Sequence, residues 1–220
     1  MNVLNRMNIA AFAGEYLGTA FLVMMFLILT QTTAVSYFIA TSVAIAMALV
    51  YMVFASVSGG HANPAVTFGF WTARKISTVR AAAYIVAQVV GALSAWGVFT
   101  YLHNTATQSV ATSFDWRVFV AEAIGAGIFS MAFAAVVLWK RDIFHSAIGI
   151  GAAIFVGVMV ASVAARGYIN PAVALGLSRF HFDWAYILGP LAGGLVGVNL
   201  YNEVFVSGKG WLESATGKKR

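Results

Sequence analysis

Continuous apolar runs long enough to cross a lipid bilayer occupy most of this chain. A hydrocarbon core of about 30 Å requires roughly 20 residues of α-helix. The apolar residues follow one another without the alternation of barrel strands, so helices are the structure that satisfies the backbone in lipid. The pattern predicts an all-α membrane protein with six transmembrane helices. They lie near residues 10–30, 35–57, 81–101, 116–138, 146–165 and 184–206.

The composition supports this interpretation. Hydrophobic residues make up 61% of the 220 residues and charged residues 9%, whereas a soluble domain has about 45–50% apolar and about 25% charged residues. The chain contains no cysteine, which excludes a disulfide framework and a thiolate metal site. The first apolar run has no small-residue cleavage site and is long enough to span, so we expect a retained helix and no signal peptide.

The net charge of +6 is distributed unevenly over the predicted loops. With both termini in the cytoplasm, ten basic residues face inward and three face outward, as the positive-inside rule requires. We therefore expect a multi-pass protein of the cell membrane, with a cytoplasmic tail at 207–220 and no nucleic-acid partner. The inner set is Arg6, Arg74, Lys75, Arg80, Lys140, Arg141, Lys209, Lys218, Lys219 and Arg220, and the outer set is Arg117, Arg166 and Arg179.

The two halves of the chain are related by an internal sequence repeat. Glu15 and Glu122 are 107 positions apart, and so are Asn63 and Asn170, each followed by Pro-Ala-Val. Each copy holds three spans, so the second copy enters the membrane from the opposite side and the repeats are inverted. We predict one domain over residues 1–220, with repeat 1 at about 10–101 and repeat 2 at about 116–206.

The two Asn-Pro-Ala segments predict short helices that enter the membrane without crossing it. Pro64 and Pro171 suit the first helical turn, and the preceding asparagines suit N-caps. Each helix has about eight residues, which is roughly 12 Å. Two such half-helices meeting end to end cover most of the apolar core. Non-helical backbone at that depth requires surrounding protein or a water-filled cavity, which predicts a pore.

These motifs resemble those of the aquaporin, or major intrinsic protein, family. The segment Ser58-Gly59-Gly60-His61-Ala62-Asn63-Pro64-Ala65-Val66 is similar to the first signature loop of that family, and Asn170-Pro171-Ala172 to the second. The resemblance implies a right-handed bundle of six helices with two re-entrant half-helices, one pore per subunit and a homotetramer. It also implies passive passage of water and small uncharged solutes. The pore motifs would be Asn63, Pro64 and Ala65 with Asn170, Pro171 and Ala172.

Each polar residue near the predicted pore has two interpretations. Opposed helix N-termini carry about half a positive charge each and repel cations, and the asparagine amides either orient pore water or serve only as caps. Buried Glu15 and Glu122 need donors. They act either as a proton relay or as struts for the re-entrant loops, the role that the resemblance implies. His61 is either a gate or a neutral group lining the inner vestibule.

The outer constriction departs from the family pattern. The resemblance implies four filter positions, usually with an aromatic residue and an arginine after the second signature. Here none is aromatic or charged, so we expect a wider, apolar filter that favours carbon-bearing solutes such as glycerol. Arg166 either reaches into the space left by the missing filter arginine or remains at the outer surface, and Tyr168 is a candidate to fill the space lost at Gly167. The four positions are Val43, Val158, Gly167 and Val173.

Other function classes lack the residues they need. The chain has no Gly-x-Ser-x-Gly motif, His-Glu-x-x-His motif or pair of transmembrane aspartates, so we predict no enzyme, no catalytic or metal site and no cofactor. An ion channel would need rings of acidic residues, and their absence from the predicted pore argues against this class. The remaining alternatives are a glycerol facilitator with low water selectivity and a closed structural member of the fold, which an apolar constriction permits by dewetting.

Overall fold

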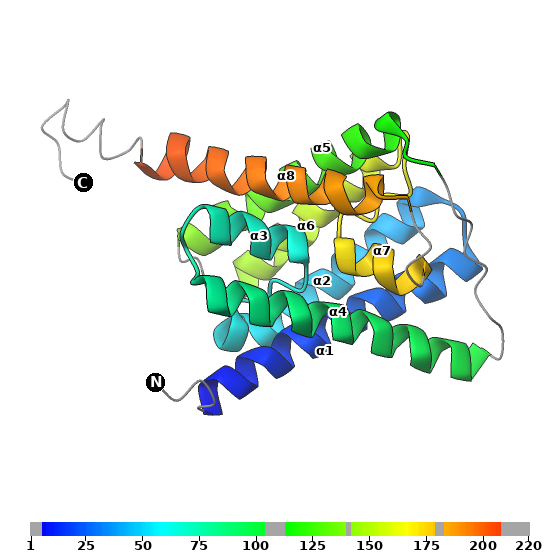
Figure 1. Ribbon diagram of the computed structural model, residues 1–220, viewed down its shortest axis with the longest axis horizontal. Helices are drawn as coiled ribbons and strands as arrows, with labels where there is room; N and C mark the ends of the chain where they lie inside the picture. Colours follow the sequence, from blue (N-terminus) through cyan, green and yellow to red (C-terminus); the bar gives the residue numbers. More distant parts are fainter. Residues whose placement is uncertain (1–5, 104–112, 140–141, 179–182, 208–220) are drawn as a thin grey trace, which may run out of the picture.

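The computed structural model describes residues 6–103, 113–139, 142–178 and 183–207 (Figure 1). In these ranges the chain forms eight α-helices and one π-helix and no strand, which confirms the all-α prediction. The helices are α1 (Arg6–Thr32), α2 (Ser36–Ser58), α3 (Pro64–Thr72), α4 (Thr78–His103), α5 (Trp116–Leu138), α6 (Ile143–Ala161), α7 (Pro171–Ser178), α8 (Ala185–Tyr201) and the π-helix η1 (Asn202–Ser207).

The long helices correspond to the predicted spans. Five of them, α1, α2, α4, α5 and α6, are long and apolar enough to cross a membrane. The sixth, α8, has 17 α-helical residues and continues directly into η1, so the two together cover residues 185–207, against a predicted run at 184–206. Helix α6 ends at Ala161, four residues before the predicted boundary. The predicted tail beyond Ser207 lies outside the described residues.

The helices pack in a pattern that is the same for both halves of the chain (Figure 1). Helix α1 contacts α2 and α4, and correspondingly α5 contacts α6 and α8. The short helices cross over, because α3 packs mainly on α8 of the second half and α7 packs mainly on α4 of the first. The two halves therefore enclose each other's half-helix.

Glycine residues allow the helix backbones to approach each other closely at these crossings. A Cβ atom added to Gly69 of α3 would overlap the carbonyl oxygen of Gly194 on α8, and one added to Gly194 would overlap that of Ala65. At Gly97 of α4, by contrast, an added Cβ would meet nothing within 4 Å. Small residues at helix contacts are the usual means by which membrane helices approach each other.

The outward faces of the long helices are apolar. Exposed side chains include Phe38 and Ile45 of α2, Val86 of α4 and Val196 of α8. A water-soluble monomer rarely exposes so large an apolar surface. This surface is suited to lipid.

Candidate functional site

The two half-helices begin as their sequences predict. Pro64 and Pro171 are the first residues of α3 and α7. Asn63 Oδ1 accepts a hydrogen bond from the Ala65 amide at 2.8 Å, and Asn170 Oδ1 accepts one from the Ala172 amide at 3.0 Å. These bonds confirm the N-cap predictions. Figure 1 shows α3 and α7 end to end in the middle of the bundle, and the two helices contact each other.

The asparagines also bind across the two repeats. Asn63 Nδ2 donates to the Ile169 carbonyl at 3.0 Å, and Asn170 Nδ2 donates to the Ala62 carbonyl at 3.0 Å. An amide nitrogen carries two hydrogens, so each asparagine keeps a second donor after its cross-repeat bond. The arrangement can present two amide donors to a molecule at the meeting point of the half-helices.

The two carbonyls that receive these bonds belong to residues in an unusual conformation. Ala62 has φ 46° and Ile169 has φ 43°, a left-handed region that few residues other than glycine occupy. Sequence reasoning missed both residues, although they are separated by the same 107 positions as the asparagines. Such a conformation persists only where surrounding contacts fix it.

Glu15 and Glu122 supply those contacts from inside the membrane helices. Glu15 accepts from the amides of His61 at 3.0 Å and Ala62 at 2.7 Å. Glu122 accepts from the amides of Tyr168 at 3.0 Å and Ile169 at 2.5 Å. Both carboxylates are fully buried. The structure thus brings each glutamate together with the loop of its own repeat.

The first glutamate has further donors on α2 and α4. Ser58 Oγ and Gln88 Nε2 each donate to Glu15 at 2.7 Å. Gln88 also donates to Thr67 Oγ1 at 2.9 Å, and Thr67 Oγ1 lies 3.1 Å from His61 Nδ1. Because Thr67 already accepts from Gln88, its own hydrogen is available to His61, an arrangement that favours a neutral ring. The sequence does not predict these hydrogen bonds of Thr67 and Ser58, because hydroxyl side chains are common in membrane helices.

The four predicted filter positions all lie in the apolar interior. Gly167 has φ 67°, and a Cβ added there would lie 2.8 Å from the Val158 carbonyl and 3.1 Å from its side chain. The structure therefore brings Gly167 and Val158 into contact. Val43, Val158 and Val173 have no exposed surface and belong to one hydrophobic cluster.

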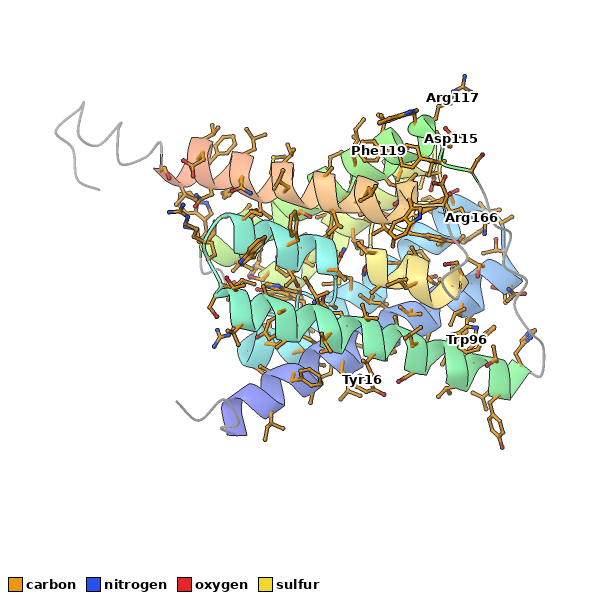
Figure 2. The ribbon with its side chains drawn as sticks, viewed as in Figure 1. Tyr16, Trp96, Asp115, Arg117, Phe119 and Arg166 are labelled. Carbon is orange, nitrogen blue, oxygen red and sulfur yellow. The ribbon has the colours of Figure 1, made fainter. Side chains whose placement is uncertain are left out.

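Arg166 lies at one end of the bundle (Figure 2). Its Nη1 atom lies 3.4 Å from the Tyr168 hydroxyl, and its amide donates to the Tyr186 hydroxyl at 3.2 Å. The Tyr168 ring is edge-on to Phe26 of α1, with centroids 6.0 Å apart, and lies 4.9 Å from the Tyr186 ring. The described contacts of Arg166 are thus with tyrosines, and Tyr168 packs between α1 and α8.

Comparisons with a family model and with individual proteins identify the same family. The family model described as major intrinsic protein matches residues 3–201. Nodulin-26 of Glycine max is 32% identical over 165 residues, which are 71% of this chain and 60% of that protein. Aquaporin TIP1-1 of Zea mays is 33% identical over 184 residues, which are 77% of this chain and 72% of that protein.

A solved structure shows the same fold. The aquaglyceroporin from Plasmodium falciparum superimposes with a TM-score of 0.70 at 21% sequence identity, covering 90% of this chain and 95% of that one. The aligned region amounts to about three fifths of the length of the nodulin-26 and rice Aquaporin NIP1-1 relatives. On the extent of the family match and of these alignments, this chain belongs to the major intrinsic protein family.

Proposed function

We propose that this protein is a passive transmembrane channel for water and small uncharged solutes. The observation that carries the proposal is the pair of half-helices whose N-termini meet inside the bundle, with Asn63 and Asn170 bonded crosswise between the repeats. Relatives named aquaporins and a structural neighbour named aquaglyceroporin support the same function.

Ions are excluded at the meeting point of α3 and α7. Each helix N-terminus carries about half a positive charge, and the two face each other in a site with little exposed surface. The second amide hydrogens of Asn63 and Asn170 hold a passing water molecule as an acceptor from both sides. A water oriented in this way cannot relay a proton along the file.

The filter at Val43, Val158, Gly167 and Val173 sets the solute class. Apolar walls offer water no hydrogen bonds but accommodate the carbon face of a polyol. We therefore assign glycerol-sized neutral solutes to this channel together with water. Arg166 acts at the outer mouth, where it is held by Tyr168, and not as a replacement for the filter arginine.

The glutamates are structural struts in this account. Glu15 and Glu122 accept loop amides in equivalent positions and so hold Ala62 and Ile169 in the conformation that aims their carbonyls at the asparagines. His61 lines the inner vestibule as a neutral group. No step of this function calls for a cofactor or a catalytic residue.

The orientation follows from the exposed basic residues. Arg74, Lys75 and Arg80 are exposed in and beside the connection between α3 and α4, at the end of the bundle where α1 begins and η1 ends (Figure 1). Arg117 and Arg166 lie at the other end (Figure 2). We assign the first end to the cytoplasm of a cell-membrane protein, with one domain of two inverted repeats per subunit and a homotetrameric assembly.

Osmotic challenge of reconstituted vesicles tests the proposal. Vesicles containing the protein are mixed in turn with hyperosmotic solutions of sucrose, glycerol and urea. Their volume is followed by light scattering. We expect faster shrinkage than in empty vesicles for all three solutes, followed by rapid reswelling with glycerol and urea only. Shrinkage and reswelling at the rates of empty vesicles would instead support a closed structural protein.

A further inference from the structure

The half of the protein around α3 contains a cluster of aromatic rings, of which the proposed function uses only His61. The Phe133 ring of α5 is edge-on to the rings of Tyr51, His61, Phe70 and Phe129, at centroid distances of 5.7, 5.7, 5.9 and 5.8 Å. We call these five residues the aromatic collar. None is more than 8% exposed, and Phe133 has no exposed surface.

The collar lies next to the meeting point of the half-helices. His61 immediately precedes Ala62, whose carbonyl binds Asn170 at the meeting point of the half-helices. The other rings come from α2, α3 and α5, so three helices and the re-entrant loop converge here. Each of these elements contributes a ring to the cluster around Phe133.

The collar residues have equivalent positions in the second repeat. Tyr51 and Val158 are 107 positions apart, as are Gly60 and Gly167. A Cβ added to Gly60 would lie 3.3 Å from the Tyr51 ring, and one added to Gly167 would lie 3.1 Å from the Val158 side chain. Tyr51 therefore occupies the position on the inner side that filter residue Val158 occupies on the outer side.

The two sides differ in the size of the residues at equivalent positions. Phe133 corresponds to Phe26, and its contact with His61 corresponds to the contact of Phe26 with Tyr168. Tyr51, Phe70 and Phe129 instead correspond to Val158, Leu177 and Leu22. Of the four outer filter positions, Val158 is thus the one whose mirror position, Tyr51, holds an aromatic residue.

We propose that the aromatic collar is a second, size-selecting constriction of this channel, in series with the outer filter, with Tyr51 and Phe133 as its specificity-determining residues. The apolar outer filter admits glycerol-sized solutes, and the collar on the α3 side decides how fast they pass. This inference rests on the proposed function, because it concerns the rate and selectivity of that pathway.

Substitutions graded by size test the inference in reconstituted vesicles. The variants are Tyr51→Val, which installs the residue of the mirror position, Tyr51→Phe, which keeps the ring, and Phe133→Leu. The control is Phe99→Leu, which shortens a buried phenylalanine on α4 whose described ring contact is with His103 and not with the collar. Glycerol and water permeability are measured on the same vesicles, and folded protein is quantified by size-exclusion chromatography.

We expect Tyr51→Val and Phe133→Leu to raise the ratio of glycerol to water permeability roughly threefold or more, because a constriction controls solutes close to its own size most strongly. Tyr51→Phe and Phe99→Leu should stay within roughly twofold of the wild type. An unchanged ratio in folded Tyr51→Val and Phe133→Leu, with a conducting wild type, would overturn the collar while leaving the proposed function intact.

The wild-type water permeability separates the two claims. If the wild type is impermeable and Tyr51→Val conducts, the collar is confirmed as the closing element. If the wild type and every folded variant are impermeable, both the proposed function and the collar are wrong.

Discussion

The substitution Glu122→Gln weakens the link between α5 and the second re-entrant loop without changing the size of the side chain. In the wild type, one carboxylate oxygen accepts the Tyr168 amide and the other accepts the Ile169 amide. A carboxamide has a single acceptor oxygen, and its NH2 group can only donate from the other position. One of the two buried amides is therefore left facing a donor.

The cost follows from the number of amides that lose their acceptor. A buried donor without a partner costs about 1–3 kcal/mol. We expect Glu122→Gln to lower the free energy of unfolding by about that amount. Ser130→Ala is the matched control, because Ser130 is also fully buried on α5 and its hydroxyl has no hydrogen-bond partner among the described residues. Its removal breaks no hydrogen bond and so should not lower the free energy of unfolding.

Reversible unfolding in mixed micelles, followed by loss of helical circular dichroism, measures both variants against the wild type. Osmotic water permeability per folded protein is measured in parallel at several pH values. The strut account predicts lower stability and a similar flux that does not vary with pH. Normal stability of Glu122→Gln with a pH-dependent loss of flux would refute it and favour a proton relay.

Three further sets of substitutions address the pore and the helix packing. Asn63→Asp and Asn170→Asp place a negative charge where two helix N-termini repel cations, so we expect a cation or proton leak in planar bilayers; unchanged conductance of the folded double variant would argue against it. Val173→Arg adds a long, charged donor at a filter position and should lower glycerol flux more than water flux; equal glycerol flux would place Val173 outside the constriction. Gly69→Ala should destabilise the protein severely because its Cβ would overlap the Gly194 carbonyl, whereas Gly97→Ala should stabilise it by about 0.5–1 kcal/mol in thermal unfolding.

The parts of this fold that depend on local chemistry could be predicted from the sequence. Proline fixes the first helical turn and asparagine caps it wherever they stand, so α3 and α7 were placed correctly at their first residues. The length of an apolar run likewise determines a membrane helix. The sixth predicted span is the partial exception, because its last residues, from Asn202 onward, form the π-helix η1, which hydrophobicity does not indicate.

The parts that depend on contact between the repeats could not be predicted. Nothing in the types of Ala62 and Ile169 indicates a left-handed conformation, which follows from the glutamates that hold their amides and the asparagines that bind their carbonyls. The position of the Tyr168 ring between Phe26 and Tyr186 also depends on how the helices pack. The aromatic collar is spread over α2, α3, α5 and a loop, and becomes visible only once these elements meet.

The central claim is that the meeting point of the half-helices passes water and excludes ions. It is tested most directly by reconstituting the protein in vesicles that contain a pH-sensitive dye and imposing a sucrose gradient together with a pH gradient. We predict shrinkage much faster than in empty vesicles, while the internal pH changes no faster than in those vesicles. Shrinkage at the rate of empty vesicles, or fast shrinkage with collapse of the pH gradient, would contradict this account.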